Sequence, residues 1–305
     1  MTVAKAAAGG GGGGVRRYAL LLALNDSEYA RKAYSGYGNV FVDALGGGGG
    51  GERWDCFRVI DGEFPAAEEL GRYDGYVVSG SPHDAYGDER WVLRLCALLR
   101  TLHAMNKRLL GICFGHQVLC QALGGRVGKS RSGWDIGVKK VTILPHRFEG
   151  LGLFDDVDDD ELHSSASIIE VHQDEVLEVP PRGRVLAYSD KTRVEMFAVG
   201  DHVLGVQGHP EYTMDILYNL IDRLVSTHVI TRNVGEEARR TAEASEPDRR
   251  FWTGLCKGFL RGPAATAAID PPPPPPREPA GACAGAGAAA VGLACSSNDV
   301  QLAGK

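Results

Sequence analysis

Short apolar runs alternate with amphipathic segments along the first half of the chain. The apolar runs predict buried strands at Tyr18 to Leu24, Trp54 to Ile60, Gly75 to Ser79 and Lys107 to Ile112. The segments Ser27 to Tyr34 and Glu89 to Met105 have the spacing of helices. This order of strands and helices predicts a parallel sheet with right-handed crossovers and helices on both faces.

The segment Glu89 to Met105 has the clearest helical pattern in the chain. One predicted apolar face contains Trp91, Leu95, Leu98, Leu102 and Met105. The arginines of this segment, Arg90, Arg94 and Arg100, fall outside that face. We therefore expect this face to pack against the sheet.

The second half of the chain has short strand patterns without long helices between them. They lie at Gly137 to Leu144, Ile168 to His172, Arg184 to Tyr188 and Val194 to Val199. A closing helix is predicted at Thr213 to Ile230, with Ile216, Leu217, Leu220, Leu224 and Val225 on its apolar side, and Phe251 to Leu260 adds an amphipathic turn or two. The predicted fold class is α/β: a three-layer sandwich with a mostly parallel central sheet, helices on both faces and a small antiparallel extension.

Low-complexity tracts set the predicted domain boundaries. The 305 residues include 41 glycines, concentrated at 9–14 and 46–51, and six successive prolines at 271–276. Such tracts bury little apolar surface. We expect a disordered tail at 1–14, one catalytic domain at 15–262 with a loop insertion at 46–51, and a disordered tail at 263–305. The proline tract could instead contact a partner protein, because polyproline II segments dock in aromatic-lined grooves.

Charge and composition restrict the partners and the compartment. The net charge is −6 and no basic stripe is present, so we expect no nucleic acid partner. No apolar stretch is long enough for a membrane span or resembles a secretory signal. The basic residues and missing acidic residues of 1–17 leave an organelle transit segment as an alternative. Seven cysteines at irregular spacing favour a reducing compartment, and we expect the cytosol.

A cysteine stands between two glycines directly after a predicted buried strand. The segment Gly111 to Gln117 reads Gly-Ile-Cys-Phe-Gly-His-Gln and places Cys113 where the strand turns into a helix. Nucleophiles are mounted on such strand-to-helix turns, and glycines allow the neighbouring backbone to approach closely. The partial positive charge of a helix N-terminus favours a thiolate. Cys113 is therefore the candidate nucleophile, although a lone cysteine more often packs as a small hydrophobic residue, as we expect for Cys56, Cys96 and Cys120.

A matching motif follows another predicted strand at Val203 and Leu204. It reads Gly-His-Pro-Glu and contains His209 and Glu211. Side chains two positions apart on an extended segment point to the same side, so both can reach one site. The imidazole could take the thiol proton, and the carboxylate could hold the imidazole in the useful tautomer. No Cys-x-x-Cys pair or second ligand pair accompanies these residues, so we expect neither a metal nor a cofactor.

The two motifs together resemble those of the class I glutamine amidotransferases, over roughly residues 15 to 230. The resemblance implies a flavodoxin-like fold, with Cys113 as nucleophile, His209 as base and acid, and Glu211 as orienting carboxylate. It also implies an oxyanion hole at the backbone N–H groups of Phe114 and Ser81. Ser81 stands where the family more often has glycine.

The resemblance also implies where the substrate binds. It places Gly80 in the oxyanion loop Ser79-Gly80-Ser81-Pro82, Gln117 beside the glutamine pocket and His172 near the mouth of the site. Gln117 could alternatively be only a helix-surface group. A small-molecule γ-glutamyl substrate is the expected partner.

A closer resemblance, to the plant γ-glutamyl peptidases, rests on these motifs and on the late segment Leu-Cys-Lys-Gly-Phe-Leu. It implies cysteine-dependent removal of γ-glutamate from glutathione conjugates, through a γ-glutamyl thioester, in sulfur-containing specialised metabolism. Only about 75 residues follow position 230, too few for an ATP-using synthetase domain. Two alternatives stay open: a glutaminase subunit that supplies ammonia to a separate synthetase, and a non-catalytic binding scaffold.

Overall fold

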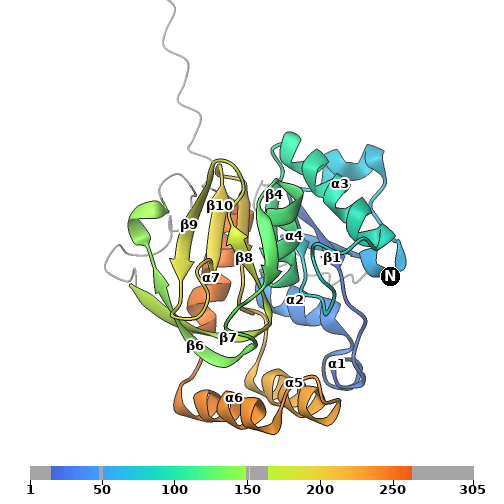
Figure 1. Ribbon diagram of the computed structural model, residues 1–305. Helices are drawn as coiled ribbons and strands as arrows, with labels where there is room; N and C mark the ends of the chain where they lie inside the picture. The colour runs from blue at the N-terminus through green and yellow to red at the C-terminus, as the bar shows by residue number, and fades with distance from the viewer. Residues whose placement is uncertain (1–14, 48–50, 149–150, 152–163, 263–305) are drawn as a thin grey trace, which may run out of the picture. The chain divides into compact units, whose positions relative to one another are not determined.

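A twisted sheet forms the centre of the computed structural model, which describes residues 15–47, 51–148, 151 and 164–262 (Figure 1). Within these residues nine strands form one sheet in the order β2-β1-β3-β4-β11-β10-β9-β6-β7. The first five of these strands are mutually parallel, and the remaining pairs are antiparallel. The predicted class, a mostly parallel sheet with an antiparallel extension, is confirmed, and the extension contains four strands.

The strand boundaries follow the apolar runs of the sequence closely. The parallel part contains β2 (Glu52–Arg58), β1 (Arg16–Leu22), β3 (Gly75–Val78), β4 (Arg108–Ile112) and β11 (Val203–Val206). The antiparallel part contains β10 (Met196–Val199), β9 (Gly183–Tyr188), β6 (Asp135–Ile143) and β7 (Ser165–His172). A separate two-stranded antiparallel sheet joins β5 (Arg126–Lys129) to β8 (Asp174–Glu178).

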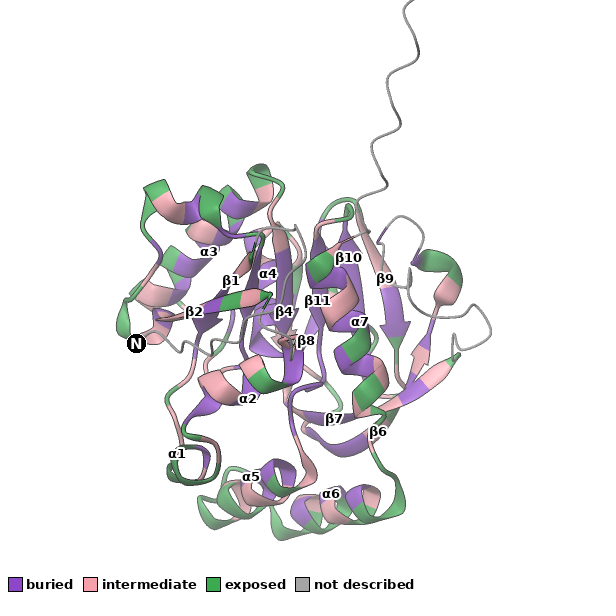
Figure 2. Ribbon diagram, turned by 180° about the vertical axis from the view of Figure 1, so that it is seen from behind, coloured by how far each residue is buried: buried purple, intermediate pink, exposed green. Residues whose placement is uncertain are grey.

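Helices cover both faces of the sheet. The helices are α1 (Glu28–Tyr34), α2 (Tyr37–Leu45), α3 (Arg90–Ala104), α4 (Phe114–Ala122), α5 (Met214–Ser226), α6 (Arg232–Ala244) and α7 (Arg249–Arg261). Short 3-10 helices occupy Val59–Asp61, Ala67–Arg72 and Pro145–Arg147. Side chains of α2 and α7 share one buried cluster with the sheet, and those of α3 and α4 share another. Figure 2 shows the buried strands between these two helical layers.

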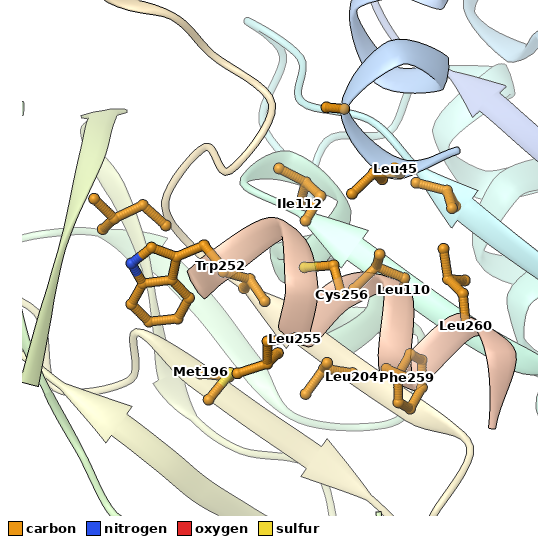
Figure 3. Close-up of a cluster of buried hydrophobic side chains, with 14 of the residues drawn as sticks. Leu45, Leu110, Ile112, Met196, Leu204, Trp252, Leu255, Cys256, Phe259 and Leu260 are labelled. Atoms are coloured by element: carbon orange, nitrogen blue, oxygen red, sulfur yellow. The ribbon is translucent and has the colours of Figure 1, made fainter. Parts of the chain in front are cut away.

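Helix α7 packs its apolar face directly on the sheet. Figure 3 shows Leu255, Cys256 and Phe259 of this helix facing Leu110 of β4 and Leu204 of β11. Cys256 and Phe259 are fully buried. The sequence pattern predicted only a turn or two here, but the helix has 13 residues. The sequence predicted a shorter helix because the polar residues Arg249, Arg250 and Lys257 interrupt the apolar pattern along the chain. In the helix these residues lie beside the apolar face.

The buried face of α3 differs from the predicted one. Its buried residues are Val92, Leu95, Cys96, Leu99 and Leu102. Trp91 and Leu98 are only half-buried, and Met105 is 41% exposed and lies beyond the end of the helix. The apolar stripe is wide enough for the helix to bury either the predicted face or the neighbouring one. Packing against α4 and the sheet selects the neighbouring face, which is shifted by one residue.

Some elements do not follow from the pattern. Helix α5 ends at Ser226 rather than Ile230, and a separate helix, α6, follows it. Helix α6 was not predicted because it is strongly charged and buries only three small residues, Gly235, Ala238 and Ala242. Helix α2 and the strands β5 and β8 were also not predicted.

Several sequence predictions fall on residues outside the described part of the chain. These are the tails 1–14 and 263–305, the proline tract 271–276, and residues 48–50 of the glycine tract 46–51. The domain boundaries at 15 and 262 therefore stay predictions. Among the helices that the structure describes, none combines the length and apolar character needed to cross a membrane.

Candidate active site

The candidate site lies where three neighbouring parallel strands end. Strand β4 lies between β3 and β11 in the sheet. Its last residue Ile112 pairs with Val206 of β11, and its Gly111 pairs with Val78 of β3. The carboxyl ends of parallel strands meet at one edge of a sheet, which is where α/β proteins commonly bind ligands. The loops that follow these strands carry Cys113, His209 and Gly80.

Cys113 occupies a strained turn between β4 and α4. Its φ is 53° and its ψ is −107°, in a region that residues with a side chain rarely adopt. The flanking glycines make the turn possible. A Cβ on Gly111 would lie 2.3 Å from the Gly115 carbonyl oxygen, and a Cβ on Gly115 would lie 2.2 Å from the Val78 carbonyl oxygen. The backbone thus holds the Cys113 side chain at the start of a helix, next to the ends of β3 and β11.

His209 and Glu211 form a buried pair beside this cysteine. His209 Nδ1 lies 2.8 Å from Glu211 Oε1, and both side chains are almost fully buried. The His209 ring also stacks face to face on Tyr212, with 4.0 Å between the ring centroids. Burial opposes the imidazolium cation, but the Glu211 carboxylate and the Cys113 sulfur outweigh it and raise the pKa of His209 well above its usual value. The imidazole therefore bridges the carboxylate and the sulfur.

The loop after β3 closes the site on its other side. A Cβ on Gly80 would lie 3.1 Å from His209 Cε1 and 3.7 Å from Cys113 Cβ, so Gly80 touches both neighbours. Ser81 lines the same cavity, and its Oγ accepts a hydrogen bond from the His83 N–H. Phe114 opens α4, where backbone N–H groups have no partner within the helix. The structure brings these predicted residues together, and their roles as oxyanion donors stay a prediction.

A cavity of about 510 Å³ opens at this point, and Cys113 and His209 lie in its wall. The other predicted residues in the wall are Ser81, Gln117 and His172. Gln117 is buried in α4 rather than exposed on the helix surface. Its Nε2 donates to the Asp174 carbonyl oxygen at 2.8 Å and to Gln207 Oε1 at 3.0 Å. His172 Nδ1 donates to the same carbonyl oxygen at 2.9 Å. Gln117 and His172 thus hold one segment of the wall.

Charged groups that the sequence analysis did not identify also line the cavity. Asp84 and Asp174 lie together in its wall, and burial and the Asp84 carboxyl raise the pKa of Asp174. Lys129 and Arg223 are cationic, and Trp134, Leu220, Leu224 and Val229 add apolar surface. Of these, only Asp174 had a sequence signal, because it follows His172 in the segment His-Gln-Asp. The others come from β5, α5 and loops that only the folded chain brings to the site.

One buried cluster in the described residues has the donor types of a metal site. One ring nitrogen of His172 and one carboxylate oxygen each of Glu170 and Glu195 lie within 4.8 Å of one another. Glu170 and His172 lie two positions apart in a strand pattern and Glu195 lies 23 positions further on, so no metal-ligand spacing in the sequence indicated the group. It lies behind the cavity wall, since only His172 of the three reaches the cavity.

Known proteins are similar to this chain over most of its length. Residues 57–222 match the family described as glutamine amidotransferase class-I. Gamma-glutamyl peptidase 5 of Arabidopsis thaliana is 48% identical over 247 residues, which cover 81% of this chain and 96% of the relative. Gamma-glutamyl peptidase 3 of the same plant is 46% identical over 247 residues, which cover 81% of this chain and 97% of the relative.

A solved structure shares the fold. A glutamine amidotransferase from Thermotoga maritima superposes with a TM-score of 0.59 at 20% identity, covering 81% of this chain and 97% of that one. The family model matches more than half of the chain, and the Arabidopsis relatives align over nearly their full length. These two findings decide the family. The chain belongs to the class I glutamine amidotransferase family.

Proposed function

We propose that this protein hydrolyses a γ-glutamyl amide bond, with Cys113 as nucleophile, His209 as base and acid, and Glu211 as orienting carboxylate. The observation that carries this proposal is the contact of the strained Cys113 elbow with the buried His209 and Glu211 pair. The names of the Arabidopsis relatives support the choice of bond.

The first half of the reaction breaks the amide bond. Glu211 accepts a hydrogen bond from His209 Nδ1–H, which leaves Nε2 for the Cys113 sulfur. His209, whose raised pKa favours the imidazolium, takes the thiol proton before the sulfur attacks the γ-carbonyl carbon. The N–H groups of Phe114 and Ser81 stabilise the resulting oxyanion. Collapse of this intermediate expels the amine, which takes the proton from His209, and leaves a γ-glutamyl thioester on Cys113.

The second half restores the enzyme. His209 removes a proton from a water molecule, whose oxygen attacks the thioester carbonyl. The tetrahedral intermediate expels the sulfur, which regains its proton from the imidazole. Glutamate leaves, and no metal or cofactor takes part in the proposed cycle.

Glutathione conjugates are the proposed substrates. The cavity of about 510 Å³ has both charged and apolar walls. Lys129 and Arg223 are suited to the carboxylates of a peptide, and the acidic pair Asp84 and Asp174 is suited to an α-amino group. Trp134, Leu220 and Leu224 offer apolar surface for a substituent on the cysteine sulfur of the peptide. The described cysteines are all free, which suits the reducing cytosol proposed for this reaction.

A panel of substrates tests the proposal. The purified protein should release glutamate from a glutathione conjugate faster than from glutathione or glutamine. Cys113→Ala should abolish this release, and Cys56→Ala is the matched control because Cys56 is half-buried and free but lies outside the cavity. Equal release by wild type and Cys113→Ala would refute the proposal.

A second candidate function is favoured by the family match itself. In this case the leaving group is ammonia, released from glutamine for a separate synthetase. The same panel distinguishes the two, because a glutaminase subunit prefers glutamine and gains activity when its synthetase partner is added.

A further inference from the structure

A second buried group of histidine and carboxylates lies behind the cavity wall, and the proposed mechanism does not use it. Glu170 and His172 belong to β7, and Glu195 precedes β10. Their exposed fractions are 0%, 4% and 2%. Glu170 also lies directly below the candidate active site, because a Cβ on Gly208 would come within 2.5 Å of Glu170 Oε1. Gly208 immediately precedes His209.

The geometry between Glu170 and His172 requires a proton. His172 Nδ1 lies 2.9 Å from the Asp174 carbonyl oxygen, which can only accept, so Nδ1 carries a hydrogen. In the neutral ring Nε2 is then an acceptor. Glu170 Oε2 lies 3.3 Å from Nε2, and neither atom has another hydrogen-bond partner among the described residues. Two buried acceptors that face each other repel unless one proton lies between them.

The charges around Glu170 also indicate that the cluster holds one additional proton. The groups that face it are Asp135 and Lys139 of β6, His172 of its own strand, Glu195, and His209 after β11. Lys191 approaches Asp135 at 3.9 Å, and His116 of α4 faces His172. Three buried carboxyls thus meet two lysines, while His209 has its own carboxylate in Glu211. One additional proton makes this cluster neutral.

Burial favours the acid form of both Glu170 and Glu195, and of the two it is Glu170 whose oxygen faces His172 Nε2. Burial, and then the Asp135 carboxylate, raise the pKa of Glu170 well above its usual value. A protonated Glu170 donates to His172 Nε2 and gives both atoms a partner.

We propose that Glu170 is a positioning residue for the substrate cavity: it shares one proton with His172, and this proton holds the imidazole against the Asp174 carbonyl oxygen. The same carbonyl oxygen accepts from Gln117, so the three residues fix one segment of the cavity wall. The effect on catalysis rests on the proposed function, because it concerns the binding of the γ-glutamyl substrate.

Two variants of Glu170 test the proposal through substrate binding. In Glu170→Gln the amide can donate to Nε2, and KM should stay within about twofold of wild type. In Glu170→Ala the donor is lost, and KM should rise by roughly tenfold with kcat nearly unchanged. Glu178→Gln is the matched control, because Glu178 is an exposed carboxyl paired with Arg126 on β5. Equal KM values for the glutamine and alanine variants would contradict the proposal.

The pH dependence gives a readout that a purely structural role does not change. In wild type the shared proton is lost at alkaline pH, so KM should rise there. Glu170→Gln has no such proton, so its KM should stay flat over the same range. An identical alkaline rise in both proteins would overturn the proposal.

A third measurement needs no substrate, so it separates failure of this proposal from failure of the proposed function. A nitrogen NMR spectrum of the His172 ring in the full-length protein should show hydrogen on Nδ1 in wild type and Glu170→Gln. In Glu170→Ala this signature should broaden or change, and a ring that is identical in all three proteins would refute the proposal. One equivalent of divalent metal in purified wild type, absent from Glu170→Gln, would also refute it and assign the cluster as a metal site.

Discussion

At the scale of single residues, the site depends on how one imidazole is placed between a sulfur and a carboxylate. His209 is fixed by the 2.8 Å contact with Glu211 and by the stacked ring of Tyr212. Both restraints come from residues within three positions of His209 in the chain. The motif therefore contains most of the geometry of the base, and the sequence alone predicted that His209 and Glu211 reach one site.

Replacement of Glu211 tests this placement. Glu211→Gln should lower kcat/KM by about 10²- to 10⁴-fold, because an amide can stabilise the wrong tautomer and cannot stabilise the cation. The Glu211 carboxylate raises the pKa of His209, so its removal should move the alkaline limb of the pH profile to lower pH. The measurement is kcat/KM over a pH series. A variant with an unchanged alkaline limb would exclude Glu211 as the orienting group.

The remaining site residues show where prediction from sequence reached its limit. Cys113 and His209 were found because glycine and proline constrain the backbone next to them, which leaves a local signal. Arg223 and Lys129 had no such signal, because each is an ordinary charged residue on its own element and reaches the cavity only through the fold. Glu170 likewise had no local signal, because it lies within an ordinary strand pattern.

At the scale of elements, the core is held by helices on the two faces of the sheet. The strands β1, β3, β4 and β11 of the parallel half were predicted because they are largely buried and read as continuous apolar runs. Helix α6 was not, because it packs through small residues such as Ala238 and Ala242 and is otherwise charged. The buried face of α3 was wrong by one position because a wide apolar stripe does not specify its own orientation.

Truncation of a buried residue on α7 tests the contribution of this helix. Phe259→Ala should lower the free energy of unfolding by about 3 to 5 kcal/mol, because Phe259 is fully buried against Leu204 of the sheet. The matched control is Leu93→Ala on α3, where the side chain is 55% exposed and the loss should stay below about 0.5 kcal/mol. Urea denaturation gives both values. Similar losses for the two variants would show that α7 does not anchor on the sheet as described.

At the scale of the whole molecule, the buried carboxyl cluster of Asp135, Glu170 and Glu195 links the stability of the fold to the proposed function. The pKa of Glu170 is raised in the folded chain, so the folded state keeps this proton at pH values where the unfolded chain has released it. The resulting contribution to stability is complete below the usual carboxyl range and is lost as the pH rises through the raised value. Burial also raises the pKa of Glu195.

The pH dependence of unfolding therefore has a definite sign. Wild type should lose stability relative to Glu170→Gln as the pH rises from about 5 to about 9, by at most about 1.4 kcal/mol per pH unit for this one proton. Thermal unfolding across this range measures the difference. Glu178→Gln should show no comparable trend, since the Glu178 carboxyl is exposed and its pKa is lowered by Arg126. Parallel curves of stability against pH for wild type and Glu170→Gln would mean that Glu170 holds no such proton.

The covalent intermediate provides the most direct test of the account. Wild type mixed with a glutathione conjugate and quenched in acid should carry one γ-glutamyl group, and peptide mass spectrometry should place it on Cys113. His209→Ala should show no such adduct, because the thiol then lacks its base. An active protein that never carries the group on Cys113, or carries it on another cysteine, would contradict the central claim.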